Sequence, residues 1–134
     1  METVLIIESN PFILANLTEA FEMEGYNILS ANNGSKGVEL AVEFMPHLIV
    51  SEIHVGKMNG YEVLHVLMNT HATSGIPFIF STTKSENRDR VLALELGADD
   101  YIIKPYELDH LLTMSKMWIK SGRQRVAKQV SVCA

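Results

Sequence analysis

The sequence has a single cysteine, no long apolar run and no excess of positive charge. Cys133 has no partner with which to form a disulfide within the chain, which suits a reducing compartment. No stretch approaches the ~20 apolar residues of a membrane span, and the apolar run at 4–7 is too short for a signal peptide. A formal net charge of -5 gives no electrostatic reason to expect binding to nucleic acid or anionic lipid. We therefore expect a cytoplasmic protein with neither nucleic-acid nor membrane partners.

The composition is that of one ordinary globular domain. Hydrophobic residues make up 47% of the 134 positions and charged residues 20%, which argues against disorder. A chain of this length can bury a core without disulfides or metal. We expect one domain over residues 1–121. From residue 122 the apolar periodicity is lost, so residues 122–134 are interpreted as a frayed helix end or a linker.

Short apolar runs alternate with segments of helical periodicity along the domain. The runs predict strands at 4–7, 27–31, 48–50, 77–80 and 101–103. The periodic segments predict helices at about 12–23, 38–45, 61–68, 86–96 and 106–120, the fourth of them capped by Ser85. This alternation predicts an α/β fold, a five-stranded parallel sheet with helices on both faces. Functional residues of such sheets lie beyond the carboxyl ends of the strands, near the point where the strand order reverses.

Three motifs, in order along the chain, resemble those of response regulator receiver domains. The segment PHLIVSEIHVGKMNGYEVL is similar to the one that carries the phosphoryl-accepting aspartate of that family. LELGADDYIIKPY resembles its closing motif, and PFIFSTTKS matches the strand and hydroxyl position between the two. The similarity covers roughly the first 120 residues. It implies a flavodoxin-like receiver fold with strand order 2-1-3-4-5.

The resemblance assigns each pocket position of the family to one residue of this chain. The position of the phosphoacceptor aspartate falls on Glu52, and the two acidic positions after the first strand fall on Glu8 and Ser9. The positions that match the family are the hydroxyl, the switch aromatic and the lysine–proline pair: Thr82, Tyr101, Lys104 and Pro105. The resemblance also implies a cis Lys104-Pro105 bond. We expect an atypical receiver, or pseudo-receiver, without the phosphoacceptor aspartate.

The substitutions at 9 and 52 bear on metal binding and phosphoryl transfer. In the family, a divalent cation is held by the second acid of the first loop, the phosphoacceptor carboxylate and a backbone carbonyl. Ser9 offers a neutral hydroxyl instead, whereas magnesium requires near-octahedral hard oxygen ligands. The extra methylene of Glu52 displaces its carboxylate by roughly 1 Å, and such an error can cost ~100-fold in rate. We expect no magnesium cofactor, no phosphorylation of Glu52 and no enzymatic activity.

Two interpretations of Glu52 are open. In the first, its carboxylate stands where a phosphoryl group would, engages Lys104 and the Thr82 hydroxyl, and holds an active-like state with Tyr101 turned inward. In the second, Glu52 is a relic carboxylate paired with Lys104, with no effect on switching. Either way, the Lys104 amine is predicted within ion-pair distance of Glu52 or Glu8, because an isolated buried lysine is costly.

The last predicted helix carries the candidate partner surface. Receivers of this family usually signal through the face of the fourth helix, fifth strand and fifth helix. The stripe predicted to meet the sheet comprises Leu108, Leu111, Leu112, Ser115 and Ile119. Met114, Met117 and Trp118 widen the apolar arc and are the interface candidates, the two methionines as exposed residues. Trp118 either takes part in the interface or packs into the core.

Taken together, these features predict a protein–protein interaction module in two-component, phosphorelay-type signal transduction. Its expected partner is a histidine kinase, an output domain, another signalling protein or a second copy forming a homodimer. One alternative is a phosphorelay receiver that accepts phosphate at an unusual residue. Another is a flavodoxin-like small-molecule-binding module, although the loop ESNPF lacks a run of hydroxyl or glycine residues able to cradle a phosphate.

Overall fold

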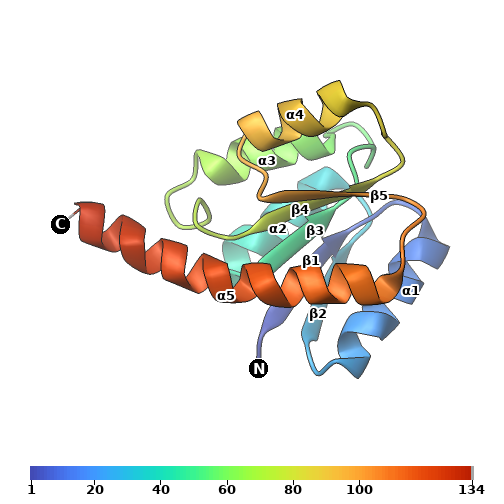
Figure 1. The fold of residues 1–134 in the computed structure, drawn as a ribbon, viewed down its shortest axis with the longest axis horizontal. Coiled ribbons are helices and arrows are strands. Elements are labelled where there is room, and N and C mark those ends of the chain that lie inside the picture. Colours follow the sequence, from blue (N-terminus) through green and yellow to red (C-terminus); the bar gives the residue numbers. More distant parts are fainter. Residues whose placement is uncertain (134) are drawn as a thin grey trace.

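The computed structural model describes the backbone of residues 1–133 and the side chains of residues 1–122. Five strands alternate with five helices (Figure 1). In chain order they are β1 (Thr3–Ile7), α1 (Pro11–Met23), β2 (Asn27–Ala31), α2 (Gly34–Phe44), β3 (Leu48–Ser51), α3 (Gly60–Met68), β4 (Phe78–Thr82), α4 (Asn87–Glu95), β5 (Asp100–Ile103) and α5 (Leu108–Cys133).

The strands form one parallel sheet in the order β2-β1-β3-β4-β5, which confirms the predicted topology. Successive residues of the central strand β1 point to opposite faces, so a continuous apolar run supplies two cores. Leu5 and Ile7 belong to the core under α2, α3 and α4, whereas Val4 and Ile6 belong to the core under α1 and α5. Figure 1 shows these two helical layers on either side of the sheet. The strand order reverses between β1 and β3, and the loops that follow these two strands both lie at the carboxyl edge of the sheet.

Local signals account for several helix boundaries. The Asn10 side chain accepts hydrogen bonds from the N–H groups of Phe12 and Ile13, and Pro11 occupies the first turn of α1. Asn59 and Glu62 form a capping box at the start of α3. The prediction for α4 is wrong in detail, because its N-cap is Glu86 and no side chain caps it. Ser85 therefore does not cap this helix.

The final helix begins later and runs further than predicted, over Leu108–Cys133 instead of 106–120. At Gly122 it passes close to the loop before β4, since a Cβ added there would lie 2.5 Å from Pro77 Cγ. A glycine at this crossing permits that approach, because it has no side chain to meet the proline ring. Residues 122–133 are thus helical in backbone, and the side chains beyond Gly122 lie outside the described residues.

Within the described part of the chain, none of the helices combines the length and apolar character needed to cross a bilayer.

Candidate functional site

Four predicted pocket residues meet at the carboxyl edge of the sheet. Glu8 directly follows β1, Glu52 follows β3 and Lys104 follows β5, while Thr82 is the last residue of β4. Because parallel strands end at the same edge, residues far apart in the sequence come together here. The Lys104-Pro105 peptide bond is cis, as the resemblance implied.

Lys104 is bound by both carboxylates. Its Nζ lies 2.6 Å from Glu8 Oε1 and 3.1 Å from Glu52 Oε1. The three side chains are 12%, 4% and 9% exposed, respectively. Burial lowers the pKa of Lys104, but the hydrogen bonds and negative charges of Glu8 and Glu52 outweigh it, so the pKa is raised overall. The predicted ion pair is confirmed, and it includes both partners at once.

The second oxygen of each carboxylate is also engaged. Glu8 Oε2 accepts a hydrogen bond of 3.1 Å from the N–H of Asn10, and Glu52 Oε2 accepts a short one from the N–H of Ile53. Among the described residues, Glu52 makes no hydrogen bond with the Thr82 hydroxyl, so the contact that the active-like interpretation includes is absent. The reason is that the Glu52 side chain turns back to its own neighbouring N–H.

Ser9 faces the loop that follows β3. Its hydroxyl donates a hydrogen bond of 3.3 Å to the carbonyl oxygen of His54. Ser9 is exposed, so this contact lies at the rim of the pocket. The loop after β1 is therefore connected to the loop after β3 by a neutral hydrogen bond.

The oxygen atoms of Glu8, Glu52 and Ser9 do not match the ligand set that magnesium requires. All four carboxylate oxygens of Glu8 and Glu52 already accept a hydrogen bond from an ammonium or a backbone N–H, and Ser9 acts as a donor. Magnesium demands several oxygen ligands in octahedral geometry. Nor do the described residues contain any cluster of three histidine, cysteine or acidic side chains able to hold a metal.

Thr82 and Tyr101 both bind the backbone of Lys84. Thr82 Oγ1 accepts from the Lys84 N–H at 3.3 Å, and the Tyr101 hydroxyl donates to the Lys84 carbonyl at 2.8 Å. Tyr101 is turned inward, only 3% exposed, with its ring edge-on to Phe80. Burial is the main cause that raises the pKa of Tyr101 to about 12, followed by the charges of Tyr61, Asp89 and Glu52. The phenol is therefore a neutral donor.

Sequence reasoning missed several contributors to the site. Lys84 acts through its backbone, which no residue-type signal reveals. Ser81, which is buried, shares a hydrogen bond of 2.7 Å with the Tyr106 hydroxyl. Beside Lys104 lies a pocket of about 500 Å³ between α1 and the start of α5. It is lined mainly by apolar groups from Ile13, Leu17, Pro105, Tyr106 and Leu108.

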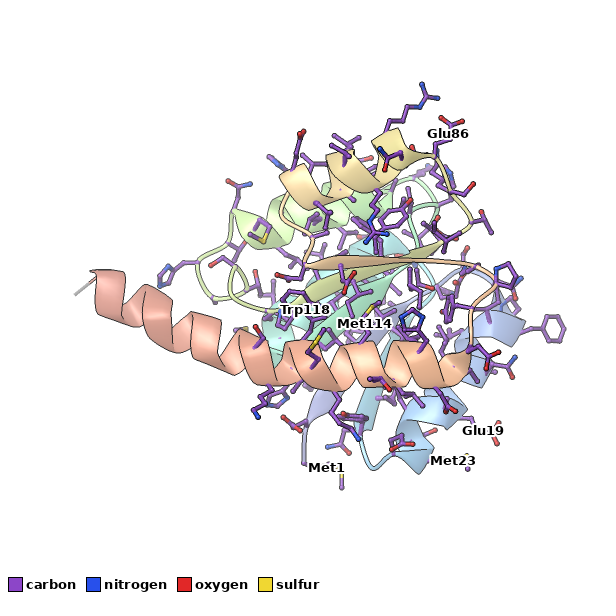
Figure 2. All side chains as sticks on the ribbon, in the orientation of Figure 1. Met1, Glu19, Met23, Glu86, Met114 and Trp118 are labelled. Atoms are coloured by element: carbon purple, nitrogen blue, oxygen red, sulfur yellow. The ribbon has the colours of Figure 1, made fainter. Side chains whose placement is uncertain are left out.

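The three interface candidates differ in their surroundings. Met117 is 57% exposed, as predicted. Met114 is not, because it is partly buried against the core under α1 and α5. Trp118 packs against the same core, and its Nε1 donates to Asp100 Oδ2 at 2.8 Å. Figure 2 shows Met114 and Trp118 on the side of α5 toward β5.

The predicted stripe of α5 is partly wrong. Leu111, Ser115 and Ile119 are buried and Leu112 is partly buried, but Leu108 is 42% exposed. Leu108 is the first residue of the helix and lies at the open pocket beside Lys104, where no neighbour covers it fully. The buried Ser115 hydroxyl is satisfied by donating to the Leu111 carbonyl at 2.7 Å.

A five-stranded parallel sheet in this order, with acidic, hydroxyl and lysine side chains at its carboxyl edge, defines the flavodoxin-like receiver class. The family model described as "Response regulator receiver domain" matches residues 4–116, and the chain belongs to that family.

Individual relatives agree with this assignment. The chain is 35% identical over 112 residues to Protein PilH of Pseudomonas aeruginosa, covering 84% of this chain and 93% of PilH. It is 33% identical over 112 residues to the DNA-binding dual master transcriptional regulator RpaA of Synechocystis, covering 84% of this chain and 46% of RpaA. A solved receiver domain of a signal transduction histidine kinase from Syntrophus aciditrophicus has 31% identity and a TM-score of 0.83, covering 90% of this chain and 92% of that one.

The matched relatives differ in length. The chain spans nearly all of PilH but about half of the length of RpaA. Receiver domains act in two-component signalling, where they interact with histidine kinases and output domains, and they are generally not enzymes.

Proposed function

We propose that this receiver domain is a cytoplasmic protein–protein interaction module whose pocket is not phosphorylated at Glu52. The observation that carries the proposal is the Lys104 ammonium held between Glu8 and Glu52. In a phosphorylating receiver, carboxylates at these strand ends supply the nucleophile and the cation site. Here both are committed to an internal ion pair, and Ser9 adds no charge.

The chemistry of transfer explains why this arrangement is unfavourable. Phosphoryl transfer depends on a positioned nucleophile and on a cation that neutralises the developing charge. Glu52 would have to break hydrogen bonds to Lys104 and Ile53 before attack. The domain therefore acts by binding and not as an enzyme, and the magnesium site of the family is lost.

The surface of α4, β5 and α5 is the proposed partner site. Each element presents exposed large apolar side chains: Val91, Leu92, Leu94, Ile103 and Met117. Apolar exposure of this kind marks interaction surfaces. Tyr101 on β5 is turned inward beneath this surface, and its hydroxyl donates to the Lys84 carbonyl in the loop before α4. The partner is a histidine kinase, an output domain or a second copy of this chain.

Incubation with acetyl phosphate and magnesium, followed by intact-mass measurement, tests the proposal. The chain should gain no phosphoryl group. The matched control is the double variant Ser9→Asp with Glu52→Asp, which restores the acidic set of the family and should be labelled. Labelling of the parent chain would refute the proposal, and peptide mapping would then separate Glu52 from an unusual acceptor such as Ser51, Ser81 or Thr83.

A second candidate function is binding of a small molecule, and the apolar pocket of about 500 Å³ beside Lys104 favours it. Its volume and lining fall in the range of small-molecule sites. Native mass spectrometry of the protein purified from cells tests this function. A stoichiometric bound compound would support it, and an apo mass alone would exclude a resident ligand.

A further inference from the structure

A second cavity lies at the amino edge of the sheet, at the opposite end of the strands from the Lys104 ion pair. Its volume is about 280 Å³, and its walls come from the loop before β3, the loop before β4 and the part of α5 around Ile119. Figure 1 shows α5 leaving the sheet on this side. No residue of the carboxyl-edge pocket lines this cavity, so a function of the cavity does not depend on phosphoryl chemistry.

Hydrogen bonds hold both loops in place. The N–H of His47, in the loop before β3, donates to the Thr3 carbonyl of β1 at 2.8 Å. The buried Thr73 hydroxyl, in the loop before β4, donates to the Leu67 carbonyl of α3 at 2.7 Å. A ligand would therefore meet walls that are already formed, which lowers the entropic cost of binding.

The lining of the cavity is apolar. Met45, Ile76, Pro77 and Ile119 contribute to it, and among the described residues no aspartate, glutamate, lysine or arginine does. An ion that leaves water needs a charged or hydrogen-bonded partner, so this lining favours a neutral molecule. The volume lies just below the range of about 300–1,000 Å³ that is typical of ligand sites, which restricts the ligand to a small one.

His47 offers one hydrogen-bond donor to this cavity. Its Nδ1 accepts a hydrogen bond of 3.0 Å from the N–H of Thr3. Because a backbone N–H can only donate, Nδ1 carries no proton in the neutral ring, and the proton lies on Nε2. Within the described part of the chain, Nε2 makes no hydrogen bond. The Nε2–H group is therefore available to an acceptor on a ligand.

Met45 points to an aromatic ligand. It lines the cavity and is 41% exposed, so its side chain stands at the rim. A methionine thioether adapts its shape to what it covers and makes favourable contacts with aromatic rings. The opposite wall, at Pro77 and Ile119, is rigid and apolar.

We propose that this cavity is a binding site for a small neutral aromatic molecule with a hydrogen-bond acceptor, which receives the Nε2–H of His47. The inference goes beyond the proposed function, because the two sites lie at opposite edges of the sheet. Since α5 supplies one wall, the ligand binds only while α5 is docked. Binding therefore stabilises the docked position of this helix by mass action.

Amide NMR titration of the full chain tests the inference with acetophenone, a neutral ring that carries a carbonyl acceptor. Saturable shifts are expected at the amides of Met45, His47, Ile76 and Ile119. Ethylbenzene has the same ring without the acceptor and should bind roughly 2- to 10-fold more weakly, the usual worth of one hydrogen bond. Benzoate, which carries a charge, should bind more weakly than acetophenone.

A variant that fills the cavity supplies the matched comparison. Ala72 lines the cavity and is exposed, so Ala72→Leu should fold and abolish the acetophenone shifts. Ala15→Leu, the same change at an exposed position of α1, should leave them unchanged.

Four results would overturn the inference. They are the absence of saturable shifts in the parent chain, equal binding by Ala72→Leu, benzoate binding more tightly than acetophenone, and shifts at Ile13 and Tyr106 instead. The last result would place the ligand in the pocket beside Lys104 and so support the second candidate function. Equal affinities for acetophenone and ethylbenzene would refute the role of His47.

Discussion

Trp118 and Asp100 join the last helix to the edge strand of the sheet. The indole N–H donates to Asp100 Oδ2 at 2.8 Å, while Asp100 Oδ1 accepts from the N–H of Tyr101. One carboxylate thus binds both α5 and the residue whose ring lies beneath the proposed partner surface. The position of α5 and the backbone at Tyr101 are physically connected.

Trp118→Phe should lower the free energy of unfolding by about 1–3 kcal/mol. The ring would still pack, but a hydrogen bond to a carboxylate is lost and Asp100 keeps an unsatisfied oxygen. Urea unfolding measures this loss. Met117→Leu, an exposed change one residue away, should leave stability within about 0.5 kcal/mol of the parent. If the two variants unfold alike, the indole bond does not stabilise the docking of α5.

Tyr101 should make the fold sensitive to alkali. Its pKa of about 12 lies above its ordinary value of 10.0, so the folded state holds the proton more tightly than the unfolded state. The associated stability is complete below pH 10 and is lost as the pH rises toward 12. Two pH units at about 1.4 kcal/mol each give about 3 kcal/mol.

Tyr101→Phe checks this dependence. The variant should be less stable at neutral pH, because the bond to the Lys84 carbonyl is lost. Between pH 10 and 12, however, its stability should decline less steeply than that of the parent. Residual decline is expected, since burial also raises the pKa values of Tyr61 and Tyr106. Parallel curves from denaturant unfolding would contradict the assignment to Tyr101.

Ser9→Asp should raise the affinity for magnesium. The new carboxylate would supply a hard ligand at the rim of the pocket, next to the His54 carbonyl that Ser9 now binds. Isothermal titration calorimetry measures the affinity, with Ser9→Asn as the uncharged control of the same shape. Since Ser9 is exposed, both variants should fold. Equal titrations for the two variants would count against the role given to the lost acid.

Met117→Glu should abolish association through the α4–β5–α5 surface without unfolding the domain. Met117 is the most exposed large apolar side chain among the described residues of α5. Met23→Glu is the control and should have no effect, because Met23 is 81% exposed at the end of α1, away from this surface (Figure 2). Sedimentation velocity over a concentration series measures self-association, and equal self-association of Met117→Glu and the parent would show that this surface is not the interface.

Glu52→Gln tests whether the pocket and the same surface are coupled. If Glu52 holds an active-like state, its neutral variant should weaken association by roughly 5- to 150-fold, the usual range of such coupling. Unchanged association would identify Glu52 as a relic carboxylate.

Much of the fold could be predicted because its signals are local. The apolar run at β1, the Asn10–Pro11 start of α1 and the glycines after α1 and α4 each specify one boundary. The pocket positions followed from the motifs, and the Lys104 ion pair from the cost of burying a lone charge. The element boundaries need only a residue and its immediate neighbours, whereas the pocket inferences also needed the family resemblance that places Glu8, Glu52 and Lys104 together.

The remaining features depend on three-dimensional detail. The conformation of the Glu52 side chain decides whether its carboxylate contacts the Thr82 hydroxyl. Here the carboxylate accepts a hydrogen bond from the Ile53 N–H instead. The burial of Met114 depends on the exact rotation of α5 against the sheet. The length of α5 was missed because Gly122 signals a helix end in the sequence, whereas here it permits a close crossing with Pro77.

The close contact between Gly122 and Pro77 also determines how α5 extends beyond the sheet. Past Gly122 the helix continues to Cys133, a span of about 16 Å at the usual rise per residue. The ring of Pro77 packs directly against a residue without a side chain, so any larger residue at 122 would push α5 away from the loop before β4. The Trp118–Asp100 hydrogen bond lies four residues before this crossing, so the two contacts together fix the direction in which α5 leaves the sheet. The part of α5 before the crossing, from Leu108 to Gly122, is about 21 Å long at the same rise per residue, so somewhat less than half of the helix extends past Pro77.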